Sequence, residues 1–333
     1  MNLNFLNSID SEKSSLIDYA NLISNLLLPQ KKFSDKKNLN FFFQDYSKGI
    51  PILLPYGLKC FNYYDDKYFL LHIQDIVKGI FSLDNKQYVG IQRFILNGLK
   101  FIQNGKPKNK YNEFINKINF YNETQKNKIK KLSGKGYSVV AFQTRNFPHL
   151  GHEAIINYLL SKVDYVVVNP LIGPKKRGDA KNELLVESYN FLIEKKFNNK
   201  VYILPIIANM FYAGPREACH HAIIRKNIGF THFCVGRDHA GAENIYDVNL
   251  ASRITKKLES KLKINIIKTG GAFFCLKCKK SIVKDECNHS EQYLRDISGN
   301  NFREELINNR YYEYADIELQ DFLRKKNKKL FQD

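Results

Sequence analysis

Mainly apolar runs alternate with amphipathic segments along the second half of the chain. Runs at residues 139–142, 164–168 and 201–207 are bounded by Gly, Pro or polar residues, as buried strands are, and a fourth starts at Thr231 and ends in residues 236–241. Segments near 150–160, 184–193 and 251–262 have helical spacing. Because strands joined by crossover helices form parallel sheets, the pattern predicts an α/β domain.

The N-terminal part has a different pattern. Four apolar residues at helical intervals predict a first helix that Pro29 ends, namely Leu16, Ala20, Ile23 and Leu27. From residue 41 to about 99, short apolar segments alternate with Gly, Asp and Asn, which indicates β structure. A lysine-rich polar stretch at 121–136, with a helix near residue 128, then connects to the α/β part. We therefore predict an N-terminal domain at residues 1–128 and a second domain at 129–333.

Composition adds little to this picture. The net charge of +19 would suit a protein that attracts polyanions. The lysines are scattered among many Asn and Ile residues, however, so drift in composition is the favoured explanation. No apolar run is long enough for a transmembrane helix, and the N-terminus lacks the basic and apolar regions of a signal peptide. Six cysteines, three of them clustered late in the chain, indicate a reducing cytoplasm.

Residues 135–156, KGYSVVAFQTRNFPHLGHEAII, carry most of the candidate chemistry. The strand ends in a polar quartet, QTRN, and Pro148 prevents it from continuing. A helix is then predicted from about Leu150, within the HLGH turn that contains His149, Gly151 and His152. A helix N-terminus attracts anions, and a glycine without Cβ lets a phosphate approach the backbone. Two histidines in a turn can be plain surface residues, but the quartet before them argues for a phosphate site.

A second strand-to-helix turn lies at residues 210–221. His220 and His221 are adjacent and cannot share a helix face, so we expect one packed and one polar or exposed, and neither as a ligand. The loop at 169–179 contains Lys175, Lys176 and Arg177, which lie over a polyphosphate or form a solvated lid. The lysine-rich end at 324–333 is expected to be a solvated tail.

A metal site is predicted near the C-terminus. The spacing C-x2-C-x8-C-x-H is formed by Cys275, Cys278, Cys287 and His289. Three thiols and an imidazole suit tetrahedral Zn²⁺, and no ligand position stays open, so the site is structural. We expect a small knuckle, an insert at about 272–292, whose folding depends on the metal.

The stretch FQTRNFPHLGHE resembles the signature of ATP sulfurylases, which belong to the HxGH nucleotidylyltransferases. Two further stretches resemble the same family: NPLIGPKKRGD at 169–179 and MFYAGPREACHHAIIRKNIGFTHFCVGRDHAG at 210–241. ISGNNFR at 297–303 is similar to the ISGTxxR motif of the superfamily, with Asn300 in place of Thr. The resemblance implies a Rossmann-like nucleotidylyltransferase domain after a β-rich, PUA-like N-terminal domain. Some microbial members carry a similar zinc site.

The family reaction is that of a sulfate adenylyltransferase: ATP and sulfate give adenosine 5′-phosphosulfate and diphosphate. Sulfate attacks the α-phosphorus directly in line, and because it needs no deprotonation, no general base is expected. Mg²⁺ is expected to arrive with ATP. The resemblance also implies a homodimer or larger homo-oligomer. No membrane partner is expected from the sequence, and a nucleic-acid partner is disfavoured.

The resemblance also implies roles for individual residues. The predicted sulfate contacts are Gln143, Arg145 and the backbone N–H near Ala240. The predicted catalytic residues are Thr144, Arg145, Asn146, His149 and His152. The predicted ATP contacts are Gln143, Asn146, His149, His152, Gly236, Arg237, Asp238, His239, Ser298 and Arg303.

Two other functions are compatible with parts of the sequence. One is a related nucleotidylyltransferase that uses another oxyanion or a phosphorylated acceptor, against which Gln143 with Arg145 favours sulfate. The other is a non-catalytic RNA-binding protein, suggested by the charge and the PUA-like region. Intact QTRN, HLGH and GRDHAG stretches argue against the second.

Overall fold

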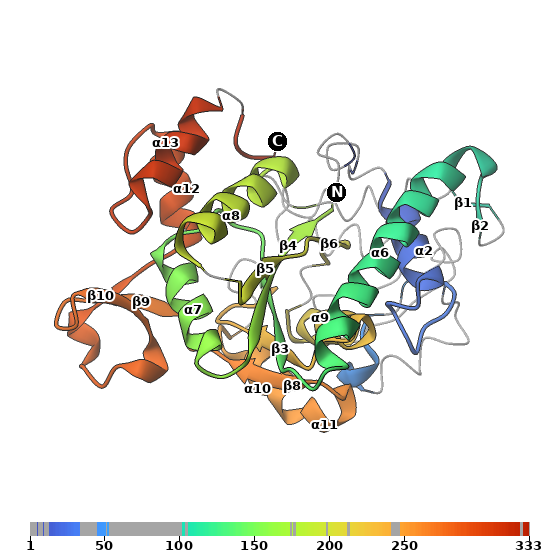
Figure 1. The fold of residues 1–333 in the computed structure, drawn as a ribbon, viewed down its shortest axis with the longest axis horizontal. Coiled ribbons are helices and arrows are strands. Elements are labelled where there is room, and N and C mark those ends of the chain that lie inside the picture. Colours follow the sequence, from blue (N-terminus) through green and yellow to red (C-terminus); the bar gives the residue numbers. More distant parts are fainter. Residues whose placement is uncertain are drawn as a thin grey trace.

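A computed structural model describes most of the chain after residue 105 and part of the N-terminal region (Figure 1). The described residues are 5, 9, 13–33, 45–50, 52, 102–103, 106–173, 175, 178–197, 199–211, 214–240, 247–326 and 329–332. Most of the segment predicted to be β-rich, residues 41–99, lies outside them, so the PUA-like domain stays a prediction.

A parallel sheet forms the centre of the molecule. Its strands run in the order β5-β4-β3-β7-β8, with β6 also paired to β4. Their bounds are β3 (Val139–Thr144), β4 (Tyr165–Ile172), β5 (Val201–Ile203), β6 (Ile206–Ile207), β7 (His232–Val235) and β8 (Asn265–Lys268). In register, Phe142 of β3 lies between Val168 of β4 and Cys234 of β7. The predicted α/β architecture with a parallel sheet is confirmed.

Both faces of this sheet are covered, which explains its nearly continuous apolar strands. Val139 and Ala141 belong to one buried apolar cluster, whereas Val140 and Phe142 belong to the other. Successive side chains of a strand point to opposite faces, so each face receives every second residue. The first cluster includes residues of α2 (Ser14–Ile23), α6 (Asn112–Ser133), α9 (Gly214–Ile228) and α10 (Leu250–Lys257). The second includes residues of α7 (Leu150–Leu160), α8 (Asn182–Lys196), α12 (Gly299–Ile307) and α13 (Ile317–Lys325).

The two described N-terminal helices pack on the first of these faces. In α2, Leu16 and Ala20 are buried as predicted, but Ile23 is 42% exposed, because the helix ends there. Helix α6 contacts the sheet edge, where Tyr121 donates a hydrogen bond of 2.9 Å to the Pro205 carbonyl. The predicted domain boundary at residue 128 lies inside α6. The other short N-terminal elements are η2 (Tyr46–Lys48), β1 (Ile102–Gln103), β2 (Lys106–Pro107) and η4 (Asn109–Tyr111).

A small antiparallel sheet follows the main one. Its order is β10-β9-β11, with β9 (Ala272–Cys275), β10 (Lys280–Val283) and β11 (Leu294–Asp296). Short helices η5 (Lys284–Glu286) and η6 (Glu291–Tyr293) connect its strands, and α11 (Glu259–Leu262) precedes β8. Strands β9 and β10 lie against α7, so this sheet is held next to the helix of the HLGH turn (Figure 1).

The expectation of a solvated tail is wrong for residues 329–332. Their backbone pairs with that of residues 178–181. The Gln332 N–H donates a hydrogen bond of 2.8 Å to the Asp179 carbonyl, and the Lys181 N–H donates one of 3.0 Å to the Leu330 carbonyl. The ring of Phe331 lies 5.5 Å from that of Phe147, between centroids. Leu330 and Phe331 are apolar residues within a charged sequence, and they pack against the second apolar cluster.

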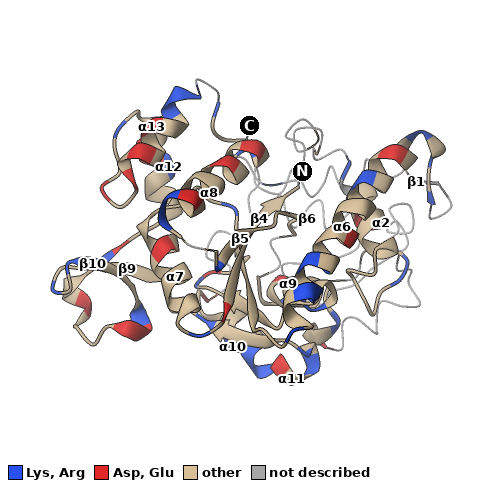
Figure 2. Cartoon of the chain, viewed as in Figure 1, with Lys and Arg blue, Asp and Glu red and all other residues tan. Residues whose placement is uncertain are grey.

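Charge is dispersed over the molecule. Figure 2 shows lysines and arginines on α6, α8, α11 and α13, with acidic residues among them. Among the described helices, none combines the length and apolar character that a bilayer crossing requires.

Candidate active site

The candidate site lies at the carboxyl edge of the central sheet. Strand β3 ends at Thr144, between β4 and β7, and continues into Arg145, Asn146 and α7. Because the strands are parallel, the loops after β3, β4 and β7 leave the sheet at this same edge, where ligands bind in open α/β sheets. These loops contain most of the residues predicted to act.

The two histidines of the HLGH turn form the N-terminal cap of α7. The Nδ1 atom of His149 accepts the Gly151 N–H at 3.1 Å, and Nδ1 of His152 accepts the His149 N–H at 3.3 Å. The two rings are 4.0 Å apart between centroids, and both are buried. An imidazole that accepts at Nδ1 carries its proton at Nε2 when neutral. No described group accepts either Nε2–H, so both rings keep a donor for a ligand.

Burial keeps these rings neutral. It lowers the pKa of His152 to about 3, and burial together with His152 lowers the pKa of His149 well below its usual value. The donors of this turn are therefore neutral N–H groups at pH 7. Gly151 is needed for the cap itself, since a Cβ there would lie 3.0 Å from the His149 ring and 3.3 Å from the Ala272 Cβ.

Asn146 contacts the start of α12. A Cβ on Gly299 would lie 2.7 Å from the Asn146 amide nitrogen, so the amide occupies that space. Ser298 caps α12 by accepting the Asn301 N–H at 3.2 Å. Thr144 is buried and lies 3.1 Å from the Tyr189 hydroxyl. The QTRN and ISGNN stretches, far apart in sequence, thus meet at one place.

A buried carboxylate that the sequence reasoning missed joins two of the predicted residues. Asp179 is fully buried, with Oδ2 at 3.2 Å from Arg145 Nη1 and Oδ1 at 3.4 Å from Arg303 Nη2. Its only signal in the sequence is its place at the end of the NPLIGPKKRGD stretch. Lys175 also lies here: it donates 2.8 Å to the Ala180 carbonyl, and burial lowers its pKa to about 8. Lys176 and Arg177 lie outside the described residues.

His220 and His221 are both buried, at 5% and 0% exposure, so neither is exposed; His220 packs on the Phe211 ring, whereas His221 lies among polar groups. His220 Nδ1 accepts the Ile50 N–H at 3.3 Å, which ties α9 to the N-terminal segment. His221 lies 3.1 Å from Gln143 Nε2 and 3.1 Å from His239 Nε2. Sequence spacing along one helix could not show this, since the partners come from β3 and from the loop after β7.

The loop after β7 is anchored to the start of α9. Asp238 and Ala240 have positive φ angles of 52° and 57°, and the Ala240 carbonyl accepts the Gly214 N–H at 3.1 Å. No described group accepts the Ala240 N–H. Arg237, next to Gly236, is exposed, and its guanidinium pairs with the Asp296 carboxylate at 2.7 Å. Asp296 lies two residues before Ser298. Its side chain therefore faces the β11–α12 junction, not the His221 cluster.

The Cys and His residues of the predicted knuckle converge. The Sγ atoms of Cys275, Cys278 and Cys287 and the Nδ1 atom of His289 all lie within 4.8 Å of one another. Two Sγ–Sγ distances are 3.7 and 3.9 Å, and the three Sγ–Nδ1 distances are 3.3 to 3.4 Å. A tetrahedral zinc with Zn–S bonds of about 2.3 Å places its sulfurs about 3.8 Å apart. The donor set fits a zinc ion. No other group of three or more such ligands occurs among the described residues.

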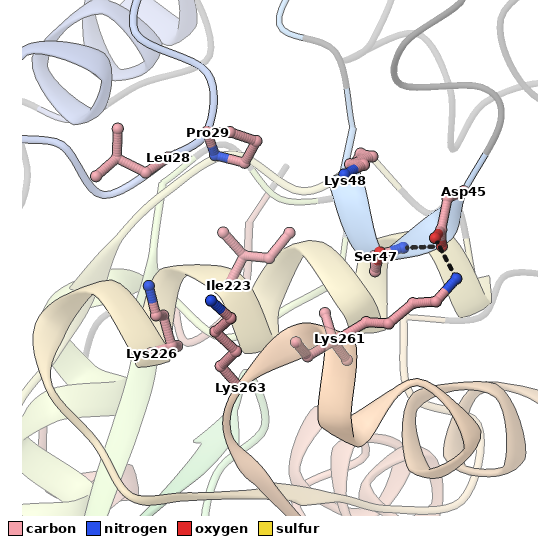
Figure 3. A pocket seen from close by; sticks show the side chains of 10 residues that line it. Leu28, Pro29, Asp45, Ser47, Lys48, Ile223, Lys226, Lys261 and Lys263 are labelled. Carbon is pink, nitrogen blue, oxygen red and sulfur yellow. Dashed lines mark hydrogen bonds and ion pairs between the residues drawn. The ribbon is translucent and has the colours of Figure 1, made fainter.

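A cavity of about 550 Å³ lies elsewhere, between residues 28–29, η2, the end of α9 and α11 (Figure 3). It contains none of the predicted site residues. Lys226 and Lys261 stand in the last turns of α9 and α11, where cations offset the helix dipole, and Lys261 pairs with Asp45 at 2.7 Å. Helix-end electrostatics accounts for two of its lysines, and the cavity lies apart from the HLGH turn.

The sequence of this chain is similar to those of known proteins. The sequence profile of the family described as ATP-sulfurylase matches residues 119–312. A sulfate adenylyltransferase of Pyrococcus abyssi is 45% identical over 175 residues, which are 52% of this chain and 46% of that protein. Those of Ignicoccus hospitalis and Persephonella marina are 36% and 32% identical and cover 78% and 77% of this chain, and 66% and 72% of their own lengths.

The chain spans about half the length of the first of these relatives. The matched region nevertheless is more than half of the chain and includes the HLGH turn, Asp179 and the cluster of Cys275, Cys278, Cys287 and His289. The chain belongs to the ATP sulfurylase family.

Proposed function

We propose that this protein is a sulfate adenylyltransferase that forms adenosine 5′-phosphosulfate and diphosphate from ATP and sulfate. A sulfate oxygen attacks the α-phosphorus, and the bond from that phosphorus to the leaving diphosphate oxygen breaks on the opposite side. No proton moves. The observation that carries the proposal is the edge of β3, where Gln143 and Arg145 shortly precede an HLGH cap whose two Nε2–H donors no described group accepts.

The difficulty of this reaction is the approach of two anions. Arg145 supplies a fixed positive charge for sulfate, because Asp179 holds its guanidinium at 3.2 Å. Gln143 and the Ala240 N–H, which no described group accepts, add neutral donors for the same anion. Arg303, held by the other Asp179 oxygen, and the Ser298 cap would face the ATP phosphates together with Asn146 and Arg237.

The histidines act as neutral donors in this proposal. Their Nε2–H groups stabilise the charge that develops on the α-phosphoryl group and on the leaving diphosphate, as preorganised donors do in other transferases. Gly236, Asp238 and His239 form the nucleotide side of the site, and Thr144 holds the end of β3 against Tyr189.

Mg²⁺ would neutralise the phosphates of ATP. The described residues offer no carboxylate cluster for it, since Asp179 is engaged by two arginines. We therefore propose that Mg²⁺ enters with the nucleotide and assign it no protein ligand.

Zinc is proposed as the resident metal of the Cys275, Cys278, Cys287 and His289 cluster, where it would hold β9 and β10 against α7. This cluster lies next to the helix of the HLGH turn, so zinc would support the site without touching a substrate. Thiolate ligands need a reducing compartment, which is consistent with a cytoplasmic protein. Elemental analysis should find about one zinc per chain; its absence would remove this part of the proposal.

A diphosphate-release assay tests the reaction. The full chain is incubated with ATP and Mg²⁺, with and without sulfate, and radioactive sulfate is followed into adenosine 5′-phosphosulfate. Release that requires sulfate supports the proposal, and Arg145→Ala should then raise the sulfate KM more than the ATP KM. Release that requires a different oxyanion or a phosphorylated acceptor, with no labelled product, would overturn it in favour of a related nucleotidylyltransferase.

A further inference from the structure

His221 lies at the centre of a buried polar cluster beneath the proposed sulfate site. It projects from α9 and is fully buried. Its Nδ1 atom is 3.1 Å from Gln143 Nε2 and 3.1 Å from His239 Nε2, and its Nε2 atom is 3.4 Å from a Glu217 oxygen. One side chain therefore touches a proposed sulfate contact and a proposed nucleotide contact, and it reaches no solvent itself.

The surroundings of His221 fix where its proton sits. Glu217 is also fully buried, and the oxygen that faces His221 accepts the Phe211 N–H at 2.9 Å. The 3.4 Å contact is too poorly aligned for a hydrogen bond, but a lone pair on Nε2 would face the negative carboxylate, so the His221 proton is favoured on Nε2. Burial, with the charges of Arg225 and Arg145, holds the pKa of His221 well below its usual value, so the ring stays neutral. Its Nδ1 atom then offers a lone pair.

That lone pair selects one orientation of the Gln143 amide. The NH2 end faces Nδ1, and the Oε1 atom is buried without a hydrogen-bond partner in the described part of the chain. An amide NH2 group has two hydrogens, so one goes to His221 and one is left. If the amide were reversed, its oxygen would take the present position of Gln143 Nε2. The second N–H would then be replaced by an oxygen, which repels an oxyanion. His221 thus decides whether Gln143 is a donor.

We propose that His221 is a positioning residue, which orients the Gln143 amide so that its second N–H meets the attacking oxyanion. This inference rests on the proposed function for the identity of the anion. His239 shares the same acceptor, but it also packs on the Phe233 ring at 5.5 Å. Gln143 makes no other polar side-chain contact among the described residues, so it depends on His221 more.

Three variants test the inference by steady-state kinetics. His221→Leu removes the acceptor and should raise the sulfate KM on the order of tenfold, the value of one orienting hydrogen bond, with a smaller change in the ATP KM. His221→Asn offers an acceptor oxygen near the Nδ1 position and should restore most of the sulfate KM. His220→Leu is the matched control, because it removes another buried histidine from the same helix. His220 Nδ1 accepts the Ile50 N–H and not a proposed substrate contact, so this variant should leave the sulfate KM unchanged.

Equal changes in the sulfate and ATP KM for His221→Leu, or no rescue by His221→Asn, would overturn the positioning role. A second measurement holds even if the leucine variant does not fold or if the protein does not use sulfate. Nitrogen-15 NMR of the wild-type histidines should show a neutral His221 with its proton on Nε2. A proton on Nδ1 would overturn the inference. If wild-type His221 carries its proton on Nε2 but the wild-type protein shows no sulfate-dependent turnover, only the proposed function is overturned.

Discussion

His149 combines two contributions that substitution can separate. Its Nδ1 atom caps α7, and its Nε2–H is free for a ligand. Asn is a strong cap but lacks a donor at the distant Nε2 position. We therefore expect turnover of His149→Asn to fall by a factor on the order of 10²–10³. His149→Ala should lose the same activity and also about 1 kcal/mol of unfolding free energy, because it lacks the cap of α7. Diphosphate release and urea unfolding separate the two effects. Turnover close to wild type in His149→Asn would contradict the donor role.

Asp179 acts on the site through two arginines. Asp179→Asn removes the charge that holds Arg145 and Arg303, and we expect the KM for both sulfate and ATP to rise. A hydrogen bond to a charged group contributes about 1.5–3 kcal/mol, so increases of roughly tenfold to a hundredfold are expected. Asp164→Asn is the control. Asp164 bonds Ser138 at the opposite edge of the sheet and should leave both constants unchanged. A change in neither KM for Asp179→Asn would show that the arginines need no anchor.

At the scale of elements, apolar patterning predicts the central strands and helices because each signal is local. The buried run at Val139 to Phe142 and the helix after Pro148 were readable for this reason. The errors concern contacts between distant segments. His221 meets Gln143 across 78 residues, and Asp179 meets Arg303 across 124, distances over which no periodicity extends. The sequence predicts a solvated tail because lysines dominate it, whereas Leu330 and Phe331 within it pack against the second apolar cluster.

The pairing of the tail with residues 178–181 leads to a prediction about this element. Phe331 packs on Phe147 and lies 5.9 Å from the Arg303 guanidinium, so it holds the segment that carries Asp179. Complete burial of a Phe is worth 3–5 kcal/mol on truncation, and for this half-buried ring we expect Phe331→Ala to cost about 2 kcal/mol of unfolding free energy. Gln332→Ala keeps the backbone hydrogen bonds and should cost little. Urea unfolding measures both, and equal stabilities would show that the Phe331 ring contributes nothing.

At the scale of the molecule, buried neutral histidines are distributed over the loops and helices around the site. Burial lowers the pKa of His152 and His220 to about 3, and those of His149, His221 and His239 lie well below the usual value. In the unfolded chain each would titrate near 6.5. Below that pH the unfolded state binds more protons than the folded state, so the unfolding free energy must fall as the solution is acidified.

This loss starts near pH 6.5 and, for His152 and His220, continues to about pH 3. Between pH 6.5 and 5 we expect it to be on the order of 1 kcal/mol per pH unit for each such histidine. Asp18 opposes it, because burial raises its pKa to about 7, so the folded state holds a proton there that the unfolded chain releases. Asp18→Asn should therefore make the decline on acidification steeper. Urea unfolding of both proteins across this range, with zinc added so that the thiolate cluster stays saturated, measures the two slopes. A flat profile in wild type would mean that the buried rings are charged, and the neutral donors assigned to His149 and His152 would then be lost as well.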